Sequence, residues 1–493
     1  SFSMRFPILN GWDDHIYIGD GTQLQFSLKN ILYWFSHPCE GCYLPLTMLT
    51  YMFDYFFWGL NGTGYHIQNI FWHLVAVLFV YRCMLFFGIN SWTAFLLTSA
   101  FAIHPQRVES VVWISERKDV LCAALYFASF FYFISRKEKD KFPGKSFLLF
   151  ILAMLSKPMA ISLPLVLFLH EIFIADRRDF KILFKNLAPF FILMFIFIPV
   201  TIYMQIIPEA KFSIARQIVV ILHNIMWYFH KTILPKQLSP IYPRVIFGIP
   251  LLLNVFATII FFAMLIFFMR RAEPLLFKRA GLPFLLCYLV SLAPVSGFFA
   301  LGAIDYADRY SYIPSVFIWF IIGVYLTVYF HLKPAGAEQD KSQRIYHRPI
   351  FSIVVGSIYV FLLALMTIFY SGFWTSYHSV LKAAVMHHPP SFIALGALAD
   401  LEMLKGNFNE AERLANQILS REKGWETEEG YHRILLKAEC IKAVCMYKTG
   451  RKKEALPIFE MLAKKMDQNF FTDETNYKNF LNMLDDCKKH AMP

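Results

Sequence analysis

One polar stretch decides the fold, and it reads His104-Pro105-Gln106-Arg107-Val108-Glu109-Ser110-Val111-Val112-Trp113-Ile114-Ser115-Glu116-Arg117-Lys118-Asp119. It separates two apolar segments, 93–103 and 120–134. Polar groups this dense enter a hydrocarbon phase only where they line a cavity or lie at the membrane surface. The stretch therefore predicts either a polar cavity between membrane helices or a loop at the membrane surface.

The rest of the chain is strongly apolar. It is 57% hydrophobic and 17% charged, whereas a soluble domain carries roughly 25% charged residues. Apolar runs lie at about 65–87, 91–103, 119–135, 146–156, 159–175, 187–207, 247–270, 281–297, 312–332 and 350–371. Most reach the roughly 20 residues that cross a bilayer. We expect an all-α polytopic membrane protein with about 10 membrane segments, and we expect that a first membrane helix is missing, because Trp12-Asp13-Asp14 follows the start almost at once.

The net charge of +12 comes from basic residues in short loops, which is typical of cytoplasmic loops rather than of a nucleic-acid surface. All four basic loops (136–141, 177–178, 270–279 and 333–348) fall on the cytoplasmic side under two conditions. Segments 146–156 and 159–175 form a hairpin broken at Lys157-Pro158, and segment 213–234 lies along the outer surface. Residues 1–64, 104–118, 208–246, 298–311 and everything after 371 then face outside.

The composition changes after Ser371. Residues 1–371 form the expected membrane domain, with 1–64 as its first outer loop, and residues 372–493 form a soluble helical domain outside the membrane. Two copies of one pattern resemble a tetratricopeptide repeat, with small residues at matching offsets: Leu398, Ala399, Gly406 and Ala411, then Ala443, Gly450, Ala455 and Phe459. A plain pair of helical hairpins is the alternative, since two repeats are fewer than the usual minimum of about three.

Two adjacent carboxylates, Asp13 and Asp14, lie in the first outer loop. Such groups suit a general base that takes a proton from a hydroxyl, and a turn or a helix cap is the alternative explanation. Only one of two neighbours usually points into a site. Cys39 and Cys42 predict a local disulfide or two free thiols rather than a metal site with His37.

Cations gather near these loops. Arg117 and Lys118 are suited to a phosphate, against the alternative of a solvated loop with internal salt bridges. Lys157 interrupts an apolar run and is either functional or snorkels to the surface. Arg309 either pairs with Asp308 or holds a lipid-linked phosphate beside Tyr310. The remaining site candidates are the polar residues of the opening stretch, namely His104, Glu109, Glu116 and Asp119.

These motifs together resemble the GT-C-fold membrane proteins with tetratricopeptide repeats, related to the transmembrane-and-tetratricopeptide-repeat O-mannosyltransferases and their bacterial relatives. The resemblance covers nearly the whole chain. It is carried by Trp12-Asp13-Asp14, Pro45-Leu46-Thr47, Asp54-Tyr55, Gly59-Leu60-Asn61, Gly64-Tyr65-His66, Asn69, His73, His104-Pro105, Val108-Glu109-Ser110-Val111, Trp113, Glu116-Arg117-Lys118-Asp119, Lys157-Pro158, Pro235, Leu238-Ser239, Ala307-Asp308-Arg309-Tyr310, Tyr312 and Pro314.

The resemblance implies an inverting transfer of a hexose, mannose in the family, from a polyprenyl- or dolichyl-phosphate donor on the non-cytoplasmic face. An aspartate of the first outer loop is the general base, at Asp13 or Asp14 here, and Arg117, Lys118 and Arg309 would hold the lipid phosphate. The acceptor is a protein hydroxyl, presented by the repeat domain. No cofactor is required, with a divalent cation left open. The partners are the lipid donor, the acceptor protein and membrane lipids, without nucleic acid.

Two departures from the family bear on these expectations. Leu44 stands where the family usually has Arg or His before the Pro-Leu-Thr motif, and the repeat domain is short. The short repeat domain favours a bacterial member in the plasma membrane, with the endoplasmic reticulum membrane as the alternative. Two other functions stay open: a non-catalytic membrane scaffold that assembles proteins through its repeats, and transfer to a lipid or glycan acceptor.

Overall fold

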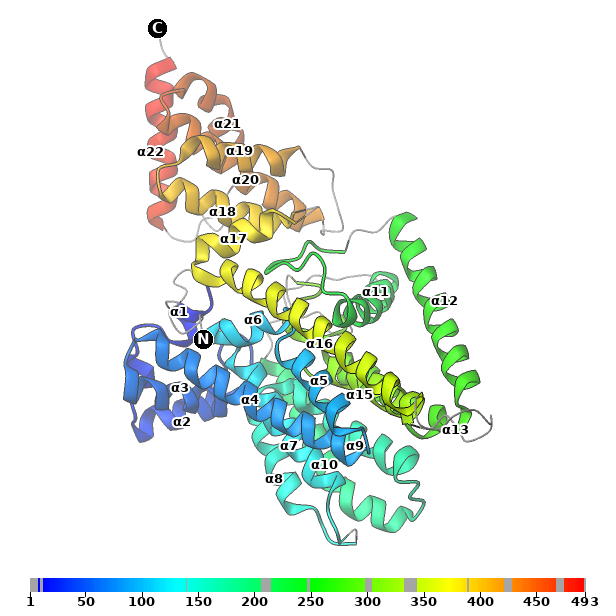
Figure 1. Ribbon diagram of the computed structural model, residues 1–493. Coiled ribbons are helices and arrows are strands. Elements are labelled where there is room, and N and C mark those ends of the chain that lie inside the picture. Colours follow the sequence, from blue (N-terminus) through cyan, green and yellow to red (C-terminus); the bar gives the residue numbers. More distant parts are fainter. Residues whose placement is uncertain are drawn as a thin grey trace. The chain divides into compact units, whose positions relative to one another are not determined.

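The computed structural model describes residues 8, 12–138, 140–204, 214–245, 249–297, 304–331, 344–387, 390–420, 428–466 and 474–491. Within these residues all named elements are helical (Figure 1), with one isolated bridge between Cys39 and Cys42. The expected all-α, membrane-type fold is confirmed. The chain divides into two compact units, Ser1–Leu238 with Ile249–Tyr377, and Ser239–Gly248 with His378–Pro493.

In the described residues of the first unit, the α-helices are numbered α1 to α16, and α1 and α13 are single turns. Their bounds are α1 Asp14–Tyr17, α2 Leu28–Ser36, α3 Pro45–Trp58, α4 Gly62–Phe86, α5 Ser91–Ala102, α6 Arg107–Val112, α7 Arg117–Ile134, α8 Gly144–Ser156, α9 Leu163–Leu169, α10 Phe180–Met204, α11 Ile214–Ile233, α12 Ile249–Ala272, α13 Pro274–Leu276, α14 Leu282–Leu292, α15 Pro314–His331 and α16 Arg344–Ser371.

Five helical segments in the described residues are long and apolar enough to cross a membrane. They are Gly62–Phe86, Phe180–Tyr203, Val255–Ala272, Pro274–Val295 and Ile353–Thr375. Four shorter apolar segments accompany them: Ser91–Ala102, Gly144–Ser156, Pro158–Ile174 and Pro314–Val328. Over its described residues, each expected span coincides with a helical segment, and the expected span 119–135 corresponds to α7. Residues 205–207, 247–248 and 332 of the expected spans lie outside the described residues. Residues 298–303 and 332–343 of the expected outer and cytoplasmic loops lie outside the described residues.

Two local features bear on the expected topology. The break predicted at Lys157-Pro158 is confirmed, because α8 ends at Ser156 and Lys157 is extended, with φ −159° and ψ 134°. Helix α11 is amphipathic: Ile214 and Ile218 are exposed while Asn224 is buried. This division is what an interfacial helix shows.

The polar stretch between α5 and α7 folds into α6 and a short 3₁₀ turn, Ile114–Glu116. Side chains of α3 and α4 bind its backbone. The Tyr51 hydroxyl donates to the Ile114 carbonyl at 2.7 Å, and Asn69 Nδ2 donates to the Trp113 carbonyl at 3.1 Å. These bonds satisfy carbonyls that would otherwise be buried without partners. Helices α3 and α4 therefore fix the direction in which residues 115–119 point.

The second unit is built from α17 Tyr377–Val385, α18 Phe392–Leu404, α19 Phe408–Leu419, α20 Glu428–Lys448, α21 Lys452–Lys465 and α22 Glu474–Ala491. Gly406 and Gly450 turn the chain between α18 and α19 and between α20 and α21, with φ of +82° and +83°. This left-handed conformation is readily adopted by glycine. Ala411 and Ala455, at matching positions after these turns, are fully buried. Two helical hairpins of the same design thus follow each other along the chain.

Candidate functional site

The charged residues of the opening stretch are buried. His104, Glu109, Glu116, Arg117, Lys118 and Asp119 are each at most 7% exposed. A solvated loop does not bury six ionisable side chains, so that alternative is excluded. Buried charges are costly unless they are paired. The pairing of these charges therefore defines the site.

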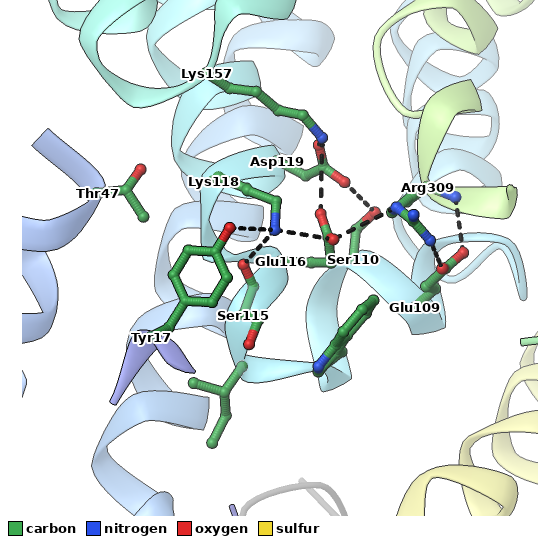
Figure 2. A network of polar contacts seen from close by, with 12 residues as sticks. Tyr17, Thr47, Glu109, Ser110, Ser115, Glu116, Lys118, Asp119, Lys157 and Arg309 are labelled. Atoms are coloured by element: carbon green, nitrogen blue, oxygen red, sulfur yellow. Dashed lines mark hydrogen bonds and ion pairs between the residues drawn. The ribbon is translucent and has the colours of Figure 1, made fainter. Parts of the chain in front are cut away.

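Six side chains form one network, which we call the Glu116 cluster: Glu109, Glu116, Lys118, Asp119, Lys157 and Arg309 (Figure 2). Glu116 lies at its centre. Its Oε1 is 3.1 Å from Lys118 Nζ and 3.4 Å from Arg309 Nε, and its Oε2 is 3.7 Å from Lys157 Nζ. One carboxylate is thus shared by three cations from three separate parts of the chain.

Glu109 connects the opening stretch to the segment that precedes α15. Its carboxylate accepts a hydrogen bond from the Arg309 backbone N–H at 2.9 Å and forms an ion pair with Arg309 Nη1, across 200 residues of sequence. Arg309 therefore pairs with Glu109 and Glu116. Asp308 faces other groups, accepting from Gln106 Nε2 and from the Tyr370 hydroxyl, each at 3.4 Å.

Lys157 belongs to the same network. It forms an ion pair with Asp119, whose other oxygen accepts a hydrogen bond from Ser110 Oγ at 3.1 Å. The Lys157 side chain is only 11% exposed, so it does not snorkel to solvent. The extended backbone at Lys157, which breaks the helix, is what allows its ammonium group to reach the cluster (Figure 2).

Arg117 does not join this cluster. Its guanidinium forms an ion pair with Asp54 at 2.6 Å, with both side chains 0% exposed. It also donates to Asn69 Oδ1 at 2.5 Å and to the Tyr65 carbonyl at 2.7 Å. Arg117 thus ties α7 to α3 and α4, while its neighbour Lys118 faces Glu116. The structure separates the two cations that the sequence grouped together.

Asp13 and Asp14 also point in different directions. Asp14 is fully buried, and its Oδ1 accepts hydrogen bonds from the backbone N–H of Ser115 at 3.0 Å and from the Ser115 hydroxyl. Asp13 is half-buried, and its carboxyl experiences the charges of Lys118, Glu116 and Arg309. Asp13 is therefore the aspartate that borders the Glu116 cluster.

The electrostatics follow from burial and pairing. Burial raises the pKa of Asp13, and Glu116 adds to this, while Lys118 and Arg309 oppose it. Burial alone would raise the pKa of Glu116, but Lys118, Lys157 and Arg309 together lower it to about 2. Burial raises the pKa of Glu109, opposed by Arg309. Asp13 thus holds its negative charge less strongly than Glu116, which suits it to accept a proton.

The remaining predicted residues lie around this centre. The Tyr310 ring has Arg309 Cζ at 4.9 Å and Lys157 Nζ at 5.9 Å. His104 accepts a hydrogen bond from the Gln106 backbone N–H at 3.3 Å, which is a local contact. Leu44, which replaces the expected cation, is buried in the apolar core with Tyr17 and Ile114.

Sequence reasoning missed Tyr17. Its hydroxyl accepts a hydrogen bond from Lys118 Nζ at 3.3 Å, and the ammonium group lies 4.6 Å from its ring centroid. Nothing in the sequence around Tyr17 distinguishes it from other aromatic residues. Ser115, which binds Asp14, belongs to the opening stretch, but its role depends on a contact across 101 residues. In the described part of the chain, no group of three or more His, Cys, Asp or Glu residues is arranged to hold a metal ion, and Cys39 and Cys42 are free thiols.

Comparison with known proteins gives the resemblance independently. The Protein O-mannosyl-transferase TMTC3 of Homo sapiens is 27% identical over 154 residues, or 30% of this chain and 17% of that protein. The Protein O-mannosyl-transferase TMTC1 of Homo sapiens is 31% identical over 115 residues, or 22% of this chain and 13% of that protein. The chain resembles the protein O-mannosyl-transferases.

A further relative, the Protein O-mannosyl-transferase F38B6.6 of Caenorhabditis elegans, is 30% identical over 181 residues, or 35% of this chain and 24% of that protein. In each case the matched segment covers less than a quarter of the relative. No family model matches the chain, and no solved structure matches it. The family resemblance expected from the motifs is confirmed at this level.

Proposed function

We propose that this protein is a membrane glycosyltransferase that moves a hexose, mannose in the first instance, from a polyprenyl- or dolichyl-phosphate donor to a protein Ser or Thr hydroxyl. The observation that carries the proposal is Asp13, a half-buried carboxylate that experiences the charges of Lys118 and Arg309, two of the three cations that share Glu116. The names of the similar proteins support transfer of mannose to protein.

In the proposed reaction the Asp13 carboxylate takes the proton of the acceptor hydroxyl. The hydroxyl oxygen bonds to the anomeric carbon from the side opposite the phosphate, and the bond between that carbon and the phosphate oxygen breaks. The electron pair leaves with the lipid phosphate, and the configuration inverts. Lys118, Lys157 and Arg309 stabilise the charge that develops on the departing phosphate, as fixed cations do in a site from which water is excluded.

The proposal differs from the sequence interpretation at one residue. Arg117 was expected to hold the phosphate, but its guanidinium is already committed to Asp54, Asn69 and the Tyr65 carbonyl. Lys157 takes its place, because its ammonium group lies within the Glu116 cluster. We place the site on the non-cytoplasmic face of a bacterial plasma membrane or of the endoplasmic reticulum membrane, with the second unit presenting the acceptor protein.

The proposal is tested with the full chain in proteoliposomes, supplied with radiolabelled polyprenyl-phosphate mannose and an envelope or microsomal extract. We expect label on protein with wild type and on neither protein nor lipid with Asp13→Asn. Label on lipid would retain the chemistry and change the acceptor. No transfer from several hexose donors, together with capture of a defined partner by the helical hairpins, would favour a scaffold instead.

A further inference from the structure

Glu116 is the shared anion of three cations, but none of these cations depends on Glu116 alone. Arg309 also pairs with Glu109, and Lys157 also pairs with Asp119. Lys118 also donates to the Ser115 carbonyl at 3.0 Å and to the Tyr17 hydroxyl at 3.3 Å. Each cation therefore keeps a second partner in place if Glu116 is removed. The three cations form a preorganised anion-binding site, and the Glu116 carboxylate occupies it (Figure 2).

Glu116 itself is held mainly by charge. It precedes α7 as the N-cap residue, but its side chain makes no capping hydrogen bond. Besides its ion pairs, its carboxylate interacts with the carboxyl of Asp119, and the nearest cation to its Oε2 atom, Lys157 Nζ, is 3.7 Å away. Displacement of Glu116 leaves the second partners of its three cations in place.

The phosphodiester group of the donor is an anion that fits this binding site. A sugar linked to a lipid through phosphate is a phosphodiester with one negative charge, which equals the charge of a carboxylate. Its free oxygens accept hydrogen bonds from Arg and Lys with the geometry that a carboxylate uses. When the phosphodiester takes the place of the Glu116 carboxylate on the three cations, the displaced side chain turns away from them or takes up a proton, because a second anion beside the same cations would be left uncompensated.

We propose that Glu116 is a placeholder for the donor phosphate: it holds Lys118, Lys157 and Arg309 in the empty site, and the phosphodiester of the donor displaces it when the donor binds. This inference rests on the proposed function and adds to it a residue that sets donor affinity. Glu116 is thus a positioning residue rather than a catalytic one, because it leaves the cations when the substrate arrives.

The alternative account makes the opposite prediction. If Glu116 only holds the cations together, its neutralisation lets them repel one another and weakens phosphate binding. If Glu116 competes with the phosphate, its neutralisation strengthens phosphate binding. A charged hydrogen-bonded contact is strong enough to change an affinity about ten-fold, so the sign is measurable.

The test uses the purified full chain in detergent with mannosyl farnesyl phosphate, a phosphodiester with the single charge of the donor, as the probe, and it measures the dissociation constant by isothermal titration calorimetry. Four proteins are compared: wild type, Glu116→Gln, Glu116→Asp and the control Glu138→Gln, which removes an exposed carboxylate paired with Lys141. We expect Glu116→Gln to bind about ten-fold more tightly than wild type. We expect Glu116→Asp, whose shorter side chain reaches the cations less well, to lie between the two, and Glu138→Gln to match wild type.

Binding by Glu116→Gln and Glu116→Asp that is equal to or weaker than that of wild type would contradict the proposal that Glu116 is a placeholder. If one of the two variants does not fold, the other one decides the test. Inorganic phosphate in place of the probe tells whether the headgroup alone displaces Glu116. Kinetics give a second readout, because tighter binding of the lipid phosphate product slows its release, and Glu116→Gln should lower KM and kcat together. Transfer by wild type without tighter binding by the variants would reject the placeholder alone. Absence of both transfer and probe binding in all four proteins would reject the proposed function as well.

Discussion

Arg117 and Lys118 are neighbours in sequence, and both face carboxylates, but they are paired in different ways. Arg117 lies in a closed pair, in which one carboxylate, Asp54, faces it at 2.6 Å and neither side chain is exposed. Lys118 lies in a shared cluster, in which the carboxylate of Glu116 forms ion pairs with three cations. In a closed pair the cation is fully engaged by its own carboxylate and does not bind a further anion. In a cluster, the shared carboxylate can be exchanged for the anion of a ligand. The contrast shows that pairing, more than charge, determines which cations are available to a ligand.

The largest effect should come from breaking the closed pair. Arg117→Met leaves Asp54 buried without a partner, and removal of one member of a buried ion pair costs about 3–5 kcal/mol of unfolding free energy. Thermal unfolding in detergent measures the loss. The double variant Arg117→Met with Asp54→Leu should recover most of it, because no buried charge is then left uncompensated. A loss of about 3–5 kcal/mol of unfolding free energy in Lys118→Met, with no loss in Arg117→Met, would contradict this comparison.

The shared cluster should be sensitive in catalysis. Arg309→Gln removes a cation that faces the departing phosphate, and loss of such a group lowers kcat by about 10²–10³-fold. Steady-state transfer assays measure the effect, with Arg178→Gln as a control at an exposed arginine. Unchanged turnover in a folded Arg309→Gln protein would show that the cluster does not contact the leaving group.

The pH dependence follows from Asp13. The carboxyl must be ionised to accept a proton, so activity falls as the pH drops through its pKa, which burial raises above 3.8. The acid limb of kcat/KM should therefore lie above that of an ordinary aspartate. Lys118→Gln removes the strongest opposing charge and should move the limb to still higher pH. A limb that moves to lower pH in this variant would argue against Asp13 as the titrating group.

The smallest effect should come from an ion pair that water reaches. In the second unit Arg451 pairs with Glu412, and their side chains are 35% and 14% exposed. Arg451→Gln should cost less than about 1 kcal/mol, since exposed pairs contribute little. Thermal unfolding under the conditions used for Arg117→Met gives the direct contrast. A loss as large as that of Arg117→Met would mean that burial does not separate the two kinds of pair.

The fold follows from the sequence because its causes are local and repeated. Apolar runs of helix length and turn signals mark the elements, and the break at Lys157 follows from a proline after a lysine within an apolar run. The opening stretch also marks a polar region, but the sequence leaves open whether it is a buried site or a loop at the membrane surface. The hydrogen bond between Glu109 and Arg309 joins this stretch to a segment 200 residues away. No local sequence pattern determines that contact.

The grouping of Arg117 with Lys118 could not be corrected from sequence. Successive residues of a helix diverge by about 100°, but neighbouring side chains can still converge on one site, as those of Lys118 and Asp119 do in the Glu116 cluster. Which of the two cations faces the site depends on Asp54 and Asn69, which lie on other helices. The division of roles between Asp13 and Asp14 is set in the same way, by Ser115.

The most direct test compares Asp13→Asn with Asp14→Asn, measuring donor binding and transfer separately in the same purified protein. We expect Asp13→Asn to bind the donor within a few-fold of wild type and to lose transfer by about 10²–10⁴-fold, the usual contribution of a general base. We expect Asp14→Asn to lower stability, through the weakened contact with Ser115, and to retain more transfer than Asp13→Asn where it folds. Wild-type transfer by Asp13→Asn, or its loss only in a stably folded Asp14→Asn, would contradict the account.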